Sequence, residues 1–218
     1  MIDMPTKGEV LAIEVPTFEL MQLYKLYHKF ELVTELSFSN HRAIDLFSGD
    51  GQIQETEEYE HINKWLNNNE YFSINIKEFR LERMYPIPEM QNAYLWNSRI
   101  PDVKFEESKN KELLSGGWSS LFWHADTYQP ENRIKMIIYL NDVNESNGAV
   151  CMEEDLTYIN DKSYSEIKNK YSCVSDIPGK FFNGNSGTAV IFRARQLHRI
   201  NFPIEKHRDT IHIGFDSE

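Results

Sequence analysis

The chain has 218 residues, and its hydrophobic content of 40% is enough to bury the core of one large domain. Its net charge of −11 argues against a nucleic-acid partner, because binding to a phosphate backbone depends on clustered lysine and arginine. Its only two cysteines, Cys151 and Cys173, do not form a disulfide framework.

A secretory signal begins with a basic segment that is followed by an apolar segment. The first residues, M-I-D-M-P-T-K-G-E-V, do not have this order. No apolar run approaches the roughly 20 residues that a membrane helix needs. We therefore expect a cytoplasmic protein without membrane contact, present as a monomer or homodimer.

The N-terminal part predicts a strand at residues 8–15, ended by Pro16. Thr17 is a candidate cap for a helix over residues 18–33, where apolar and aromatic residues recur at helical intervals. This stripe predicts a packing face.

Two further helices are predicted at residues 40–47 and 55–66, the second with acidic residues at its start, as the helix dipole prefers. Residues 71–85 then alternate between apolar and polar, which predicts a long strand, or two, with a register change near Lys77 and Glu78.

The second part of the chain predicts a succession of short strands separated by glycine, asparagine and proline. They span residues 92–100, 118–124, 133–140, 149–152, 187–193 and 209–215. A helix is possible at residues 164–171. This order predicts a mainly β (α+β) fold, an antiparallel sandwich or barrel braced by N-terminal helices. We expect one domain over residues 1–218, with a helical brace and outer strands at 1–90 and the β core at 91–218.

The sharpest chemical signal is the pair His124 and Asp126 at the end of an apolar run. On a strand, residues two apart project from the same face. His198 follows another apolar strand and is the candidate third ligand. Two histidines and one carboxylate form a facial triad that leaves coordination positions open, as non-haem Fe(II) requires. His207 and His212 are nearby alternatives.

Arg208 follows His198 by ten residues and opens the last predicted strand. A guanidinium binds a carboxylate through two parallel hydrogen bonds. Arg208 is therefore the candidate anchor for the distal carboxylate of a dicarboxylate whose 2-oxo acid end binds iron.

Four segments together resemble the Fe(II)/2-oxoglutarate-dependent dioxygenases, and most of all their phytanoyl-CoA dioxygenase-like branch. They are W-H-A-D (123–126), R-I-K-M-I-I-Y-L-N-D-V-N-E-S-N-G-A-V (133–150), G-T-A-V-I-F (187–192) and H-R-I-N-F-P-I-E-K-H-R (198–208). The resemblance covers residues 92–215 and implies a double-stranded β-helix, the cupin-like jelly roll. It also implies that His124, Asp126 and His198 hold Fe(II), that Arg208 binds 2-oxoglutarate, and that O₂ is consumed.

The segment W-N-S-R-I (96–100) is similar to a Q-S-R-I strand of ectoine-hydroxylase-like members. The similarity implies co-substrate contact for Asn97 and substrate contact for Arg99. Here Asn97 replaces the glutamine, and Pro101 replaces an asparagine that follows in those relatives.

Trp118 and Tyr128 are candidates to flank the substrate, or they simply pack. The family's usual P-G-S-H is replaced by C-M-E-E-D at residues 151–155. This departure leaves the rim of the pocket, and hence the substrate, undefined.

The expected reaction is hydroxylation of a small molecule with release of succinate and CO₂. Related halogenases lack the carboxylate ligand, so Asp126 favours hydroxylation over halogenation. Desaturation, cyclisation and epoxidation remain open. The alternatives are a cupin-like metal-binding or sensory domain without turnover, and a zinc hydrolase with the same three ligands, which leaves Arg208 without a role.

Overall fold

The computed structural model describes residues 4–30, 53–68, 74–84, 123, 125–126, 129–156, 158, 179–200, 203 and 206–217, with the backbone alone at 34–36 and 41–45. Within this part of the chain lie helices α1 (Thr17–Lys29) and α2 (Glu57–Asn67) and ten strands. The strands form two antiparallel sheets of seven and three strands.

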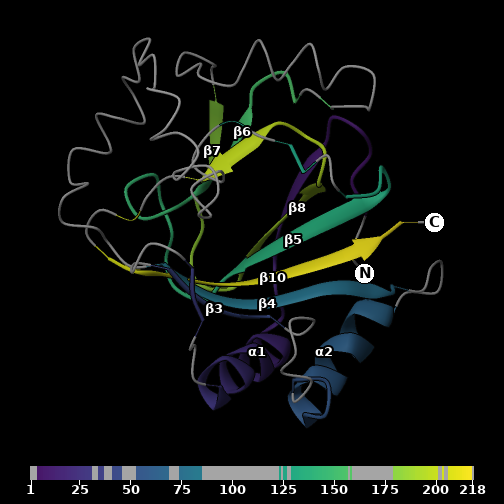
Figure 1. Ribbon diagram of the computed structural model, residues 1–218, viewed down its shortest axis with the longest axis vertical. Coiled ribbons are helices and arrows are strands. Elements are labelled where there is room, and N and C mark those ends of the chain that lie inside the picture. The colour runs from purple at the N-terminus through teal and green to yellow at the C-terminus, as the bar shows by residue number, and fades with distance from the viewer. Residues whose placement is uncertain are drawn as a thin grey trace.

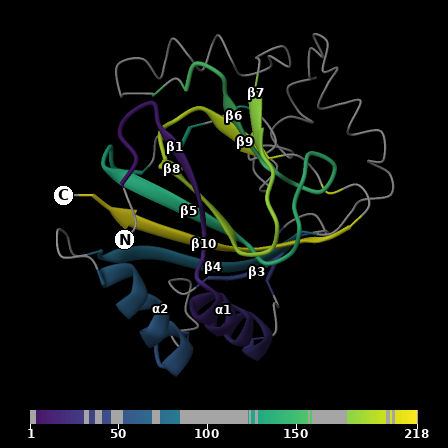
Figure 2. The ribbon, with the colours of Figure 1, turned by 180° about the vertical axis from the view of Figure 1, so that it is seen from behind.

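The large sheet has the order β1-β8-β5-β10-β4-β3-β2. Its strands, in that order, are Val10–Glu14, Thr188–Arg193, Arg133–Tyr139, Arg208–Asp216, Ile76–Met84, His41–Asp45 and Thr34–Leu36. The small sheet has the order β7 (Gly179–Phe182), β6 (Val150–Glu153) and β9 (His198–Ile200). Figures 1 and 2 show the small sheet over one face of the large sheet and both helices against the other.

Alternation along the strands of the large sheet separates two cores. Ile134, Met136 and Ile138 of β5 pack in one cluster with Leu23 of α1 and Ile62 of α2. The residues between them on β5, Ile137 and Tyr139, belong to a second cluster. That cluster also contains Val190 and Phe192 of β8, and Val150 and Met152 of the small sheet. The side chains of β5 that lie on the same face as Ile137 and Tyr139 therefore point into the space between the two sheets.

Most of the predicted elements are confirmed. Both helices around residues 18–33 and 55–66 are present, as are the strands at 8–15, 133–140, 149–152, 187–193 and 209–215. The predicted register change is also confirmed. Gly214 faces Glu78, whereas Phe215 faces Ile76, so Lys77 is the extra residue of a bulge.

Two local predictions are wrong. The helix predicted at 40–47 is wrong, because residues 41–45 form strand β3, which pairs with β4. The edge of a long strand offers backbone hydrogen bonds that override a weak helical pattern. Thr17 does not cap α1, since it is the first helical residue and Pro16 precedes it without a side-chain hydrogen bond. In α2, by contrast, Thr56 accepts a hydrogen bond from the backbone N–H of Tyr59 at 3.2 Å.

The sequence did not predict the short strands β2, β7 and β9. The predicted strands at residues 92–100 and 118–124, apart from Trp123, and the helix at 164–171 lie outside the described residues. No helix in the described ranges is both long and apolar enough to cross a membrane.

The Tyr139 hydroxyl joins the two sheets. It donates to the backbone oxygen of Phe182 at 2.8 Å and accepts from the N–H of Val150 at 3.1 Å. Burial raises the pKa of Tyr139 to about 12. The folded state therefore keeps a proton that the unfolded state loses near pH 10, so stability is expected to fall as the pH rises from about 10 to about 12.

Replacing Tyr139 by phenylalanine should lower the free energy of unfolding at pH 7 by about 1–2 kcal/mol, because two buried backbone groups lose their partner. It should also reduce the loss of stability between pH 10 and pH 12. Urea unfolding of both proteins at pH 7, 10 and 12 measures the two effects. Equal alkaline losses in the two proteins would contradict the assignment to Tyr139.

Candidate metal site and arginine cluster

The structure describes three of the predicted site residues, Asp126, His198 and Arg208. His124, Asn97, Arg99, Trp118 and Tyr128 lie outside the described residues. The roles inferred for these five stay predictions.

His198 opens β9 opposite Met152 of β6, and it faces the space between the sheets, like Ile200 two residues later. Its Nδ1 lies 2.8 Å from the backbone oxygen of Gln196. A carbonyl oxygen only accepts, so Nδ1 carries the hydrogen and Nε2 carries the lone pair. Only 4% of His198 is exposed, and its ring centroid lies 4.8 Å from that of Phe192. His198 is thus held in the tautomer that a metal ligand needs.

Asp126 is held by the same turn as His198. Its backbone N–H donates to the oxygen of Ala194 at 3.0 Å, just after β8, and only 5% of the residue is exposed. The side chain of Gln196 closes this turn by accepting from the N–H of Arg193 at 2.9 Å. Asp126 Oδ2 consequently lies 3.9 Å from His198 Nε2.

Lys135 is a residue of this site that the sequence analysis missed. It lies on β5 at the same alternation as Ile137 and Tyr139, and its Nζ contacts Asp126 Oδ2. The sequence holds a signal for it, because Lys135 stands on the same face of the strand as the apolar residues Ile137 and Tyr139. The positive charge of the ammonium group thus lies beside a carboxylate oxygen of Asp126, which is the proposed metal ligand.

The two predicted ligands that the structure describes lie close enough to reach one divalent cation. Two ligands that bind one ion at about 2.1 Å from perpendicular directions lie about 3 Å apart, so Asp126 and His198 need to approach by less than ~1 Å. A carboxylate and a neutral imidazole suit iron and its neighbours in the first transition row. Within the described ranges no group of three His, Cys, Asp or Glu converges, and the predicted third ligand, His124, is not among them.

Arg208 is fully buried at the start of β10. Its Nη1 donates to the oxygen of Gly148 at 2.9 Å, and its Nη2 donates to Glu82 Oε1 at 2.5 Å. Its Nε has no hydrogen-bond partner among the described residues. Glu82 was also missed, because it shares a strand face with Glu78 and Arg80, and such a face is normally interpreted as solvated.

Arg208, Glu82 and His212 together form a buried group that we call the arginine cluster. His212 is one of the two alternative ligands. Its Nε2 lies 3.4 Å from Glu82 Oε1 and 3.1 Å from Thr210 Oγ1. Burial lowers its pKa, so the ring is neutral at pH 7. The other alternative, His207, is half-exposed and lies 3.4 Å from Asp209. Among the described residues, His212 thus contacts Glu82 and His207 contacts Asp209, so each alternative histidine lies beside a carboxylate other than Asp126.

The polar residues of both sites lie along one face of β10 and its neighbouring strands, as the pairing of β10 with β5 shows. Gly214 is opposite Lys135, and His212 is opposite Ile137. Arg208, Thr210, His212 and Gly214 share one face, because the intervening Ile211 and Ile213 pack in the core beside the helices. The interior therefore runs from the Lys135–Asp126 pair, past His212, to the Arg208–Glu82 pair.

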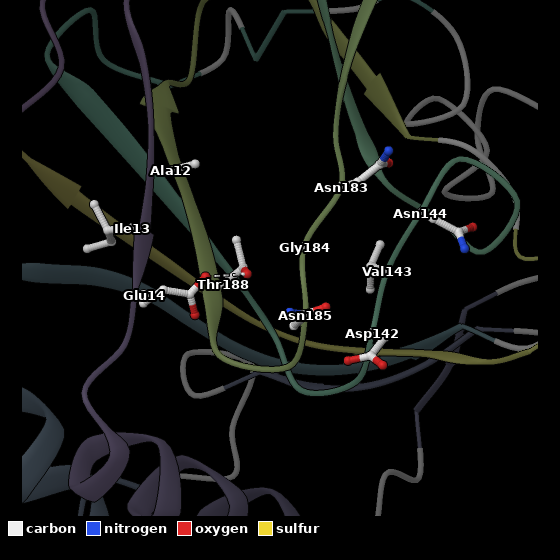
Figure 3. A pocket seen from close by; sticks show the side chains of 10 residues that line it. All are labelled: Ala12, Ile13, Glu14, Asp142, Val143, Asn144, Asn183, Gly184, Asn185 and Thr188. Carbon is white, nitrogen blue, oxygen red and sulfur yellow. Dashed lines mark hydrogen bonds between the residues drawn. The ribbon is translucent and has the colours of Figure 1, made fainter.

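An open pocket of about 550 Å³ lies elsewhere, between β1 and the loops around residues 142–144 and 183–185 (Figure 3). It is at the Thr188 end of β8, whereas His198 packs against Phe192 near the other end. Its carboxylates support the local structure: Glu14 accepts from the Thr188 hydroxyl and Asp142 from the N–H of Ser186, each at 3.0 Å. This pocket is separate from the candidate metal site.

No protein-family model and no curated protein matches the chain. Solved structures do match. The carbocyclase SnoK from nogalamycin biosynthesis, described as non-heme and alpha ketoglutarate dependent, aligns with a TM-score of 0.58 at 9% identity, over 97% of this chain and 80% of SnoK. The chain has the jelly-roll fold of this enzyme.

Two further structures support the jelly-roll fold. HygX from Streptomyces hygroscopicus, with nickel and 2-oxoglutarate bound, aligns with a TM-score of 0.54 at 11% identity, over 96% of this chain and 83% of HygX. AviO1 from Streptomyces viridochromogenes Tue57 aligns with a TM-score of 0.53 at 11% identity, over 97% of this chain and 90% of AviO1. The predicted jelly roll is thus confirmed.

Proposed function

We propose that the protein is a non-haem Fe(II)- and 2-oxoglutarate-dependent oxygenase. The observation that carries the proposal is the convergence of Asp126 and His198, both held by the turn after β8, inside a jelly roll. The fold shared with SnoK and with HygX, which was crystallised with nickel and 2-oxoglutarate, supports the same chemistry. His124 is the proposed third ligand.

The roles proposed for these residues rest on the resemblance in sequence, and those of Asp126 and His198 also on their contacts. Asp126, His198 and His124 would hold Fe(II), and Arg208 would bind the distal carboxylate of 2-oxoglutarate. Fe(II), when bound, would supply the oxidising chemistry, in which 2-oxoglutarate and O₂ give succinate, CO₂ and the oxygen atom for the substrate. Gln196 fixes the tautomer of His198, while the apolar side chains around Phe192 and Tyr139 exclude water.

The proposed reaction is hydroxylation of a small molecule, with Asn97 near the co-substrate and Arg99, Trp118 and Tyr128 near the substrate. SnoK is described as a carbocyclase, and HygX has been crystallised with hygromycin B. The fold by itself therefore does not identify the substrate. Membership of the phytanoyl-CoA dioxygenase-like branch and a cytoplasmic location belong to the same proposal.

The test is succinate formation. The protein is loaded anaerobically with Fe(II) and 2-oxoglutarate, exposed to O₂, and incubated with a library of metabolites. We expect succinate to form in a metal-dependent manner, and to increase with the true substrate. Absence of succinate with every compound, together with absence of 2-oxoglutarate binding, would refute the oxygenase. Metal binding without turnover would instead identify the cupin-like sensory domain.

Replacing Lys135 by methionine should have opposite effects on stability and metal affinity. The metal-free protein should lose about 3 kcal/mol, because Asp126 becomes a buried carboxylate without its cation. Nickel, used as a stand-in that does not turn over, should bind about tenfold more tightly, since the competing positive charge is gone. Urea unfolding and calorimetric titration measure the two effects.

The matched control for Lys135 is Lys206→Met, because Lys206 is exposed. It should change neither quantity. Unchanged nickel affinity in the Lys135 variant would show that its ammonium does not compete with the metal.

A further inference from the structure

The arginine cluster contains a carboxylate at the place where a co-substrate carboxylate is expected. One edge of a guanidinium presents the N–H groups of Nε and Nη2 side by side. In Arg83, both groups on this edge are used, because Nε and Nη2 meet the two oxygens of Asp209 at 2.6 Å each. In Arg208 only Nη2 is used, by Glu82, and the buried Nε has no partner in the described part of the chain. The edge of Arg208 is half-occupied.

In the described part of the chain, the charge of Arg208 is balanced by that of Glu82. Arg208 is fully buried and Glu82 is 3% exposed, so the pair sums to zero in a region of low dielectric. His212 adds no charge at neutral pH because burial lowers its pKa. Arg80, on the same face of β4, contacts Glu78. Among the described residues, Arg208 is the cation that a second carboxylate would share with Glu82, and two anions at one cation repel each other.

We infer that Glu82 competes with the distal carboxylate of 2-oxoglutarate for Arg208, and so sets the affinity for the co-substrate. The inference rests on the proposed function, since it assigns Arg208 to that carboxylate. When the site is empty, Glu82 neutralises Arg208 and stabilises the fold. When 2-oxoglutarate binds, its oxygens take Nε and share or replace the contact of Glu82 with Nη2.

The experiment compares 2-oxoglutarate binding to the nickel-loaded wild type and to Glu82→Gln by calorimetric titration. Glutamine keeps the size of the side chain and an acceptor for Nη2, but it removes the charge. We expect 2-oxoglutarate to bind about ten- to a hundredfold more tightly to the variant. Glu78→Gln is the matched control, because Glu78 lies on the same face of β4, four residues earlier, and it should bind like the wild type.

Thermal unfolding gives a second readout that does not depend on turnover. Glu82→Gln should unfold at a lower temperature than the wild type without 2-oxoglutarate, because Arg208 then lacks its counter-charge, and it should gain more on adding 2-oxoglutarate. Tighter binding to Glu82→Gln supports the inference even if the wild type binds too weakly to measure. Equal or weaker binding to the variant than to the wild type overturns the inference and leaves the oxygenase standing. Absence of binding to either protein overturns both.

Discussion

Replacing Asp126 by alanine is expected to abolish 2-oxoglutarate turnover and to weaken nickel binding by more than a hundredfold. Loss of a group that only orients a metal ligand typically costs 10- to 100-fold in affinity or activity, so loss of a proposed ligand should cost more. Succinate formation and calorimetric titration with nickel measure the two effects. Metal-dependent turnover by the Asp126→Ala variant would show that Asp126 is not a metal ligand.

The design must separate this loss from a loss of folding, because Lys135 would be left buried without its carboxylate. The double variant Asp126→Asn/Lys135→Met removes both charges together and should unfold close to the wild type. It should still lack turnover. Asp155→Ala, at an exposed position, is the control that should retain full activity. A double variant that folds and remains active would show that the carboxylate is not a ligand.

Replacing Arg208 by methionine should raise the 2-oxoglutarate concentration needed for half-maximal succinate formation by more than about tenfold, because the distal carboxylate loses a charged partner. The same change should lower the free energy of unfolding by about 3–5 kcal/mol, since Glu82 becomes an uncompensated buried charge. Substrate titrations and urea unfolding distinguish the two effects.

A matched double variant separates the co-substrate effect of Arg208 from its effect on stability. Arg208→Met/Glu82→Gln should recover most of the stability but not the affinity for 2-oxoglutarate. An unaltered 2-oxoglutarate requirement in both variants would show that another residue is the anchor. Recovery of the affinity in the double variant would assign the defect to misfolding.

Much of the fold was predictable because its signals are local. The apolar runs that became β5 and β8 are long and β-branched, and α2 has the spacing and acidic first turn of a helix. β3 was mistaken for a helix because only its pairing with β4 makes it a strand. The strands β2, β7 and β9 have three or four residues each, which is too short for a period to be read.

The candidate site divides in the same way. His124, Asp126, His198 and Arg208 were predicted from residue type, order and resemblance, without any contact being known. Lys135 and Glu82 were not predicted, because both strands carry other charged residues, and a charge in such a strand is normally interpreted as a solvated position. Their importance comes from partners that are distant in sequence: Lys135 meets Asp126 across a loop, and Glu82 meets Arg208 from the neighbouring strand.

The sequence by itself determined the longer strands, such as β5 and β8, because their apolar runs are local signals. It also determined the kind of chemistry that the histidine, aspartate and arginine pattern favours, because that depends on residue type and order. Only the tertiary structure decided that the turn after β8 holds Asp126 and His198 together. It also decided that Lys135 pairs with Asp126 and that Glu82 pairs with Arg208. The physical reason is that a buried charge requires a nearby partner, and the pairing of the strands and the path of the loops decide which residue that is.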